Sequence, residues 1–143
     1  MALMQIEYGS PEYHKMVKLR DEILRKPLGL AFSREDLEKE KDDILVGAFD
    51  DDRILACCLL TKMDEETVRL RQMAVRKNQQ GKGIGHSMML FAETLARDKG
   101  YKKLMMHARD TAIGFYEKQG YKTRGEQFIE VSLPHHLMEK LLV

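Results

Sequence analysis

Glycines and basic side chains cluster in the sequence "RKNQQGKGIG", residues 76–85, immediately before a stretch that favours a helix. Glycine lets the backbone approach a ligand closely, and the first turn of a helix offers N–H groups and a partial positive charge to an anion. Arg76, Lys77 and Lys82 add positive charge beside these N–H groups. The cluster therefore indicates a phosphate or pyrophosphate site, with a plain turn at the start of the helix as the alternative.

Two familiar phosphate-binding motifs do not fit this cluster. A P-loop requires G-x-x-x-x-G-K-[ST], and here Lys82 is followed by Gly83. The dinucleotide fingerprint G-x-G-x-x-G fits Gly83 and Gly85, but its third position falls on Met88. The cluster also follows a predicted antiparallel hairpin, which is too late in the chain for a doubly wound nucleotide-binding fold. A small nucleotide-binding protein is therefore disfavoured.

Cysteine and histidine offer few further candidates for chemistry. Cys57 and Cys58 are adjacent in an apolar strand, so their side chains point to opposite faces and favour neither a metal pair nor an ordinary disulfide. His135 and His136 are adjacent without a third ligand, so no metal site is predicted. His107 stands at the end of a predicted strand and can exchange a proton near neutral pH. We expect inert, buried thiols, and either a structural or a proton-transfer role for His107.

The overall charge excludes some classes of partner. The 143 residues carry 24 Lys and Arg against 23 Asp and Glu, so there is no electrostatic case for nucleic-acid or membrane binding. No apolar run approaches the ~18 residues needed to span a bilayer, and the N-terminal "MALMQIEYGS" lacks the pattern of a signal peptide. We therefore expect a single domain over residues 1–143, located in the cytoplasm.

Hydrophobic periodicity and turn signals predict elements in the order β-α-α-β-β-β-α-β-α-β-β. The strands are expected over residues 3–9, 43–49, 53–61, 67–75 and 102–108, with a closing pair within residues 121–133. The helices are expected from Ser10 to the break at Pro27, after Ser33, over residues 83–99 and over residues 110–120. A mixed order of this kind predicts an α+β sheet covered by helices.

Particular residues set the predicted boundaries of these elements. Pro11 suits the first turn of a helix, and "SRED", which begins at Ser33, forms a capping box. Asp110 is expected to cap the last helix, and Gly120 is expected to follow its end. Gly125 is expected to turn the closing strand pair, which leaves the tail "PHHLMEKLLV" as a helical turn or a loop.

Two motifs resemble those of the GNAT superfamily of N-acetyltransferases. Gln80, Gly83 and Gly85 match its Q/R-x-x-G-x-G/A signature, which follows a central strand. Downstream, "FYEKQGY", residues 115–121, resembles the second hallmark of the superfamily. The expected helix and strand lie between the two motifs. The late sequence "GEQFIEVSLPHHLM", residues 125–138, resembles a poorly characterised bacterial subgroup.

This resemblance implies a GNAT-like fold of class α+β, with a mixed, mostly antiparallel sheet, helices on both faces and splayed parallel central strands. It implies acetyl-CoA as the co-substrate, lying along the strand before the loop. The pantetheine arm and thioester would pair with the backbone of Met73, Ala74 and Val75. The pyrophosphate would lie on Gln80, Gly81, Lys82, Gly83, Ile84 and Gly85, while Arg109 would reach CoA or an acidic group of the substrate.

The resemblance implies Tyr116 as the general acid, because a phenol can protonate the departing CoA thiolate. The general base is open, because the strand before the loop offers no carboxylate until Glu66 at its start. His107 is the first candidate, acting directly or through water, and Glu130 and His135 are weaker ones.

The implied function is transfer of an acetyl group from acetyl-CoA to a primary amine by direct attack in a ternary complex. A non-catalytic acyl-CoA-binding or regulatory module is the alternative. The acceptor is expected to be a small molecule or a peptide, and neither nucleic acid nor a membrane is expected as a partner. Exposed edge strands leave a homodimer open.

Overall fold

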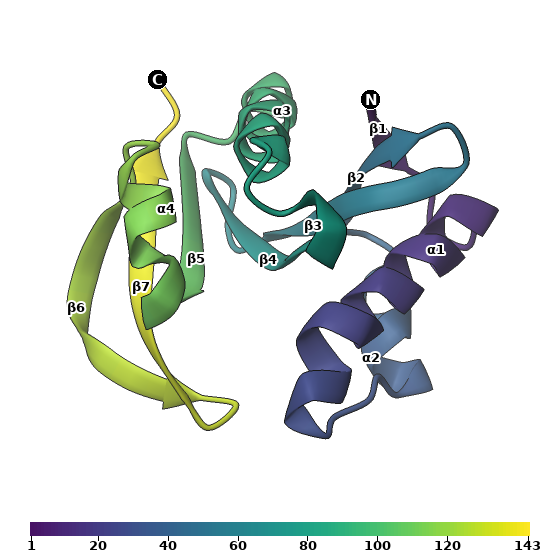
Figure 1. The fold of residues 1–143 in the computed structure, drawn as a ribbon. Helices are drawn as coiled ribbons and strands as arrows, with labels where there is room; N and C mark the ends of the chain where they lie inside the picture. The colour runs from purple at the N-terminus through teal and green to yellow at the C-terminus, as the bar shows by residue number, and fades with distance from the viewer. The chain divides into compact units, whose positions relative to one another are not determined.

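The computed structural model describes residues 1–143 and contains a seven-stranded mixed sheet in the order β1-β2-β3-β4-β5-β7-β6 (Figure 1). The strands are β1 (Ala2–Ile6), β2 (Ile44–Asp50), β3 (Arg53–Lys62), β4 (Thr67–Val75), β5 (Lys103–Arg109), β6 (Lys122–Glu130) and β7 (Leu133–Leu141). The α-helices are α1 (Pro11–Arg20), α2 (Arg34–Glu38), α3 (Ile84–Asp98) and α4 (Ile113–Glu117). The predicted order of elements and the α+β class are confirmed.

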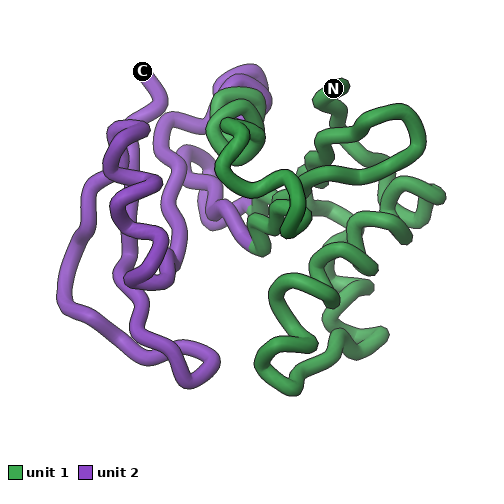
Figure 2. The backbone as a smooth tube through the Cα atoms, viewed as in Figure 1, with its two compact units in different colours: residues 1–61, 72–92 green, residues 62–71, 93–143 purple.

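Two compact units divide the chain (Figure 2). The first unit comprises Met1–Thr61 and Gln72–Ala92, and the second comprises Lys62–Arg71 and Glu93–Val143. The division falls within β4 and within α3, so each unit contains a part of both elements. The glycine loop therefore belongs to the first unit, and the "FYEKQGY" segment belongs to the second.

Helix α1 begins where the sequence indicates but ends at Arg20, before the predicted break at Pro27. The Ser10 hydroxyl accepts a hydrogen bond from the Tyr13 amide at 3.2 Å, and Pro11 occupies the first turn. The helix then widens into one π-helical turn, Asp21–Arg25, which periodicity does not reveal. A short 3-10 turn follows, and Gly29 ends it in a left-handed conformation with φ of 68°.

Helix α2 and the β2–β3 hairpin also match the prediction. Ser33 and Asp36 form the capping box of α2, because each side chain accepts from the other's backbone amide. Strands β2 and β3 pair antiparallel, and β3 is covered on both faces, so Cys57 and Cys58 are both fully buried. Burial raises the pKa of the Cys57 thiol to about 12 and raises that of the Cys58 thiol as well. The predicted burial of both thiols is confirmed.

The second unit contains the parallel pair of the sheet. The register joins the start of β4 to β5 from Thr67↔Lys103 to Leu70↔Met106, and β4 continues to Val75 beyond the last pair. Strand β7 lies between β5 and β6 and pairs antiparallel with both. The mixed sheet implied by the family resemblance is therefore present.

The predicted position of the closing hairpin is wrong. Its two strands are β6 and β7, and the turn lies at Val131 and Ser132, whose φ values are 45° and 64°. Gly125 instead lies inside β6, next to a shift in the β6–β7 register between Arg124 and Phe128. The tail is accordingly a strand rather than a helical turn or loop, since β7 finds pairing partners on both of its edges.

The predicted cap of α4 is wrong as well. The helix follows a 3-10 turn, and its N-cap position is Ala112, which makes no side-chain capping bond. The Asp110 carboxylate instead accepts a hydrogen bond from Gln127 Nε2 at 2.6 Å and lies 2.7 Å from His136 Nδ1. Gly120 does follow the end of α4, with φ of 93°.

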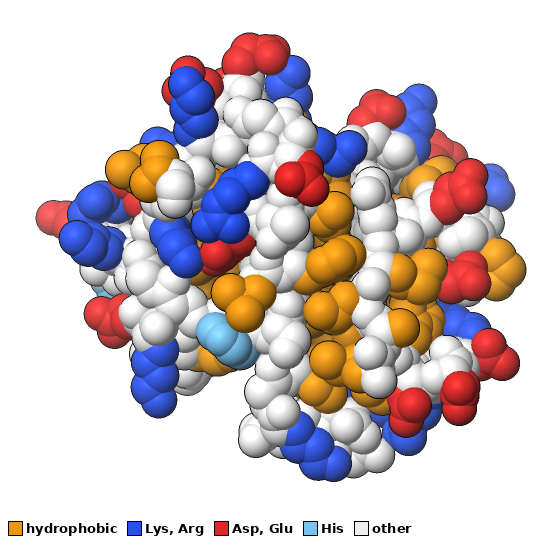
Figure 3. Space-filling view, turned by 90° about the horizontal axis from the view of Figure 1, so that it is seen from above, with side chains coloured by type: hydrophobic (Ala, Val, Ile, Leu, Met, Phe, Trp, Pro, Cys, Tyr) orange, Lys and Arg blue, Asp and Glu red, His pale blue; other side chains and the backbone are white.

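Acidic and basic side chains are interspersed on the face shown in Figure 3, in keeping with the 24 basic and 23 acidic residues of the chain. A surface with mixed signs produces no large field of one sign. No helix of the structure has both the length and the apolar character that crossing a membrane requires.

Candidate active site

The glycine loop leads from β4 into α3 in the first unit. A 3-10 turn, Lys77–Gln79, follows the strand, and Gly81 and Gly83 then adopt left-handed conformations with φ of 80° and 81°. No heavy atom lies within 4 Å of the Cβ position at either glycine, so backbone conformation rather than crowding requires glycine there. The first hydrogen bond of α3 joins the Ser87 amide to the Gly83 carbonyl, and the first turn contains no acidic residue. The loop thus offers helix-start N–H groups next to open space, as an anion site requires.

Gln80 ties this loop to the end of β4. Its side-chain Nε2 donates a hydrogen bond to the Val75 carbonyl at 3.0 Å. The predicted pyrophosphate residues and the predicted pantetheine residues are therefore held together in the first unit. Gly85 does not have a positive φ, so the loop does not need a glycine there for its backbone conformation. The left-handed glycine that the motif does not specify is Gly81.

The end of β4 has two distinct backbone edges. The Arg76 amide donates to the Leu55 carbonyl of β3, so the Ala74 amide, two residues earlier, is directed to the same strand. Because successive amides of a strand point to opposite sides, those of Met73 and Val75 point away from β3. The residue before them, Gln72, has a left-handed backbone with φ of 56°, unusual for a residue that is not glycine. This distortion lies directly before the segment predicted to bind the thioester.

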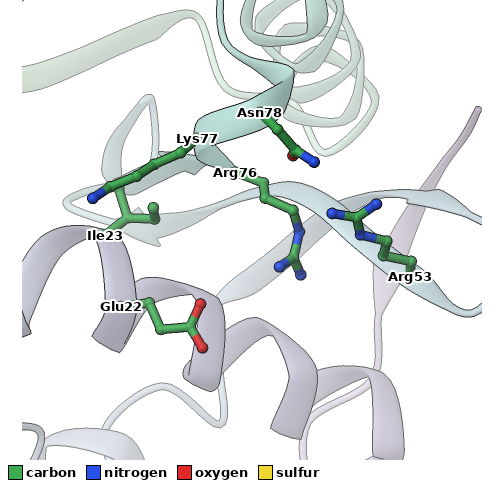
Figure 4. Close-up of a pocket in the computed structure, with 6 residues that line it drawn as sticks. All are labelled: Glu22, Ile23, Arg53, Arg76, Lys77 and Asn78. Atoms are coloured by element: carbon green, nitrogen blue, oxygen red, sulfur yellow. The ribbon is translucent and has the colours of Figure 1, made fainter.

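A pocket of about 370 Å³ lies beside the start of this loop in the first unit (Figure 4). Arg76 is fixed there, because its Nε donates to the Ile54 carbonyl at 2.9 Å and its amide donates to the Leu55 carbonyl at 2.8 Å. The pocket has three cations, Arg53, Arg76 and Lys77, and none of them belongs to an ion pair of the structure. Three cations and one carboxylate, that of Glu22, line the pocket, so its lining carries an excess of positive charge. It is lined by Glu22, Ile23, Arg53, Arg76, Lys77 and Asn78.

Sequence reasoning identified Arg76 and Lys77 as positive charge near the loop but missed Arg53. Arg53 opens β3 and is distant from the loop in the sequence, so spacing gives no signal for it. Figure 4 shows Arg53 and Arg76 among the residues that line the pocket.

Tyr116 lies on α4 in the second unit and is largely buried, at 7% exposed. Its ring makes edge-to-face contacts with the rings of Phe115 and Tyr121, at centroid distances of 5.0 and 6.0 Å. Tyr121 is fixed in turn, because its hydroxyl donates to Glu93 Oε2 at 2.7 Å. Burial and this hydrogen bond raise the pKa of Tyr121. Tyr121 is therefore a protonated support for the Tyr116 ring.

His107, the candidate base, lies on β5 within a cluster of charged groups. Its Nδ1 lies 3.0 Å from both Glu130 Oε1 and Arg69 Nη2, and its ring edge contacts Phe128. Because Nδ1 is engaged by these two side chains, Nε2 is the nitrogen of His107 that could accept a proton. Partial burial alone would raise the pKa of Glu130, but the hydrogen bond from His107 and the charges of His107 and Arg69 lower it. Glu130 is thus an ionised partner that orients the imidazole.

Arg109, the candidate for binding CoA or an acidic group, lies opposite His135, a weaker candidate base, in the β5–β7 register. His135 is 3% exposed, and its Nε2 lies 3.7 Å from Glu130 Oε2, so Glu130 lies between the two histidines that were candidate bases. His136 pairs with Asp110 instead. No group of three or more His, Cys, Asp or Glu side chains in the structure is placed to hold a metal ion.

The sequence profile described as "Acetyltransferase (GNAT) family" matches residues 6–121, and the chain belongs to this family. The uncharacterized N-acetyltransferase YjcF of Bacillus subtilis is 27% identical over 125 residues, which are 85% of this chain and 87% of that protein. The uncharacterized protein YyaT of the same organism is 31% identical over 74 residues, 52% of this chain. That alignment spans 50% of YyaT, so the chain spans about half the length of some of the curated relatives it matches.

Solved structures share the fold over the whole chain. An aminoglycoside 6'-N-acetyltransferase complexed with coenzyme A has a TM-score of 0.86 at 16% identity, covering 100% of this chain and 98% of that one. A GNAT family acetyltransferase from Elizabethkingia anophelis with acetyl-CoA bound has a TM-score of 0.73 at 21% identity, covering 98% and 97%. At these identities the likeness establishes the fold.

Proposed function

We propose that the chain transfers an acetyl group from acetyl-CoA to a primary amine. The observation that carries the proposal is the glycine loop at the start of α3, which Gln80 ties to the end of β4. Membership of the acetyltransferase family and fold neighbours solved with coenzyme A or acetyl-CoA support it.

The first unit would bind the coenzyme. Gln80, Gly81, Lys82, Gly83, Ile84 and Gly85 would hold the pyrophosphate, mainly through N–H groups at the start of α3. The segment Met73, Ala74 and Val75 would lie along the pantetheine arm and thioester. Because Ala74 faces β3 and Gln80 occupies the Val75 carbonyl, the ligand would use the amides of Met73 and Val75. An N–H there would stabilise the charge that develops on the thioester oxygen.

The second unit would supply the proton-transfer groups. The amine nitrogen attacks the thioester carbon, the C–N bond forms, and the C–S bond breaks. Tyr116 protonates the departing thiolate, and His107 Nε2 takes the proton lost by the amine, directly or through water. Arg109 would bind CoA or an acidic group of the acceptor. The acceptor is a small molecule or a peptide.

The coenzyme site can be tested with two matched glycine substitutions. Gly83→Ala and Gly9→Ala both place a β-carbon on a left-handed residue, with φ of 81° and 80°, and both have open space around it. The backbone strain is therefore matched, and the loss of stability should be alike. Calorimetric titration with acetyl-CoA should show weaker binding for Gly83→Ala alone. Equal affinities for the two variants would contradict the assignment of the loop.

Turnover can be tested by following release of free thiol from acetyl-CoA against a panel of small amines and lysine peptides. The proposal predicts thiol release that depends on the amine, together with an acetylated product detected by mass spectrometry. Binding of acetyl-CoA without turnover across the panel would favour a binding module instead. Stabilisation by ATP but not by acetyl-CoA in a thermal-shift assay would contradict both.

A further inference from the structure

A buried polar network in the first unit connects α1 to β4. Arg20 is the last residue of α1 and is fully buried, at 0% exposed. Its Nη1 and Nη2 bind the two carboxylate oxygens of Glu40 at 2.8 and 2.5 Å. The Tyr13 hydroxyl donates to Glu40 Oε1 at 2.8 Å, and the Phe32 ring lies 4.6 Å from the guanidinium carbon of Arg20. The guanidinium is therefore held in one orientation.

The Nε of Arg20 contacts the residue at the backbone distortion in β4. This Nε donates to Gln72 Oε1 at 3.3 Å, across 52 residues of sequence. Gln72 is the residue whose φ of 56° interrupts the extended conformation of the strand. A left-handed conformation at a residue other than glycine is strained and persists only where the surroundings impose it. The bond from Arg20 links the Gln72 side chain to a buried network of fixed side chains.

The backbone conformation of Gln72 affects the next residue of β4. Gln72 directly precedes Met73, and its ψ and φ set the direction in which the Met73 amide points. An ion pair buried this deeply is seldom more stabilising than apolar side chains of the same size, so its stability alone does not explain its presence. A π-helical turn begins at Asp21, directly after Arg20, and such turns are frequent at functional sites.

We propose that Arg20 and Glu40 are positioning residues, which hold Gln72 in its left-handed conformation and thereby aim the Met73 amide at the thioester carbonyl. The part that concerns the thioester rests on the function proposed above. The part that concerns the backbone of Gln72 does not.

Gln72→Met tests the network, because methionine has a similar length but offers Arg20 no oxygen. Its kcat should fall by about 100-fold, the order expected when a reacting group is misplaced by about 1 Å, while KM for acetyl-CoA changes by less than about 3-fold. Gln72→Glu keeps an acceptor oxygen for Arg20 Nε and should recover most of the lost kcat. Gln72→Gly removes the cost of the left-handed backbone, so it should retain Tm while kcat still falls.

Tyr13→Phe is the matched control. It removes a hydrogen bond to Glu40 from the same network but does not touch Gln72. Its Tm should fall, and its kcat should fall far less than that of Gln72→Met, because the bond from Arg20 to Gln72 is still present. A fall in kcat equal to that of Gln72→Met would mean that activity follows the stability of the network, and would overturn the proposal.

A crystal structure of Gln72→Met provides a test that does not depend on activity. Residue 72 should return to a negative φ when the bond from Arg20 is lost. A positive φ retained in this variant would overturn the proposal whatever the kinetics show. If the wild-type protein released no thiol from acetyl-CoA, the proposed function would fail, while the conformation of residue 72 would still decide whether Arg20 holds the backbone.

Discussion

Two buried glutamates, one in each unit, have the same kind of environment. Glu40 of the first unit and Glu93 of the second are each 2% exposed, and each accepts a hydrogen bond from a tyrosine. The bond from Tyr13 to Glu40 is 2.8 Å long, and the bond from Tyr121 to Glu93 is 2.7 Å long. In both clusters the glutamate also faces a cation, which compensates its charge.

The two cations differ in burial and in what they reach. Arg20 of the first cluster is fully buried and continues to Gln72, so this cluster acts on the backbone of β4. Lys140 of the second cluster has a side chain that is 25% exposed, and its hydrogen bonds go to Glu93. The second cluster instead fixes Tyr121, whose ring contacts Tyr116. The same chemical group thus supports a strand in one unit and a phenol in the other.

Removal of the buried cation should have the largest effect. Arg20→Met leaves the Glu40 carboxylate buried without its cation, and breaking such a pair costs about 3–5 kcal/mol of unfolding free energy. Urea denaturation of the variant and the wild type measures this difference. A loss below about 1 kcal/mol would show that Glu40 becomes protonated or hydrated at little cost, and the contrast between the two clusters would disappear.

Loss of the hydroxyl of Tyr116, whose ring the second cluster supports, should have the second-largest effect. Tyr116→Phe retains the ring contacts but removes the general acid, so kcat should fall by about 100-fold, equivalent to ~2.7 kcal/mol, with little change in KM for acetyl-CoA. Phe115→Leu is the control, since it alters an exposed neighbouring ring on the same helix. An unchanged kcat in Tyr116→Phe would remove the general-acid role.

The two hydrogen bonds to the glutamates should be alike in strength. Tyr13→Phe and Tyr121→Phe each remove one hydrogen bond to a buried carboxylate, which costs about 2 kcal/mol. Thermal or urea unfolding of the two variants tests this expectation directly. A large difference between them would show that the clusters resemble each other only in geometry.

Because of these two phenols, the free energy of unfolding should decrease at alkaline pH. Burial and the hydrogen bonds to Glu40 and Glu93 raise the pKa of Tyr13 and Tyr121 above the ordinary value of 10.0. Below that pH both states keep the phenol proton and the full stability is present. Above it the unfolded chain releases a proton that the folded chain retains, so stability falls by up to ~1.4 kcal/mol per pH unit for each phenol. Each Tyr→Phe variant should lose its share of this slope between pH 9 and pH 11, as the ordinary phenol pKa of about 10 sets that window.

Removal of the exposed cation should have the smallest effect. Lys140→Met leaves Glu93 with Tyr121 and with Arg97, which lies 3.6 Å away, and partly exposed ion pairs contribute about 1 kcal/mol or less. Its loss of unfolding free energy should be well below that of Arg20→Met. Equal losses would contradict the distinction drawn between the two cations.

Local signals predicted much of the fold because they act within a few residues. The cap at Ser10, the capping box at Ser33 and the bounds of β4 all depend on neighbours in the sequence, and all are present. The closing hairpin was misplaced because Gly125 carries a strong turn signal. The actual turn at Val131 and Ser132 has residue types that do not favour positive φ, and strand pairing imposes its conformation.

The candidate site was predictable only where a motif specifies it. The loop from Gln80 and the helix of Tyr116 follow family patterns, whereas the partners of Arg20 lie 20 and 52 residues away in the sequence. No periodicity connects such distances, so the left-handed conformation of Gln72 and the bond that holds it emerge only from the tertiary structure.

A crystal structure of the protein soaked with acetyl-CoA would show directly where the coenzyme binds. We expect electron density for the pyrophosphate on the N–H groups of residues 81–85, and for the sulfur within hydrogen-bonding distance of the Tyr116 hydroxyl. The thioester oxygen should accept a hydrogen bond from the amide of Met73 or Val75. Density for the pyrophosphate away from the glycine loop, or a sulfur remote from Tyr116, would contradict this placement of the coenzyme.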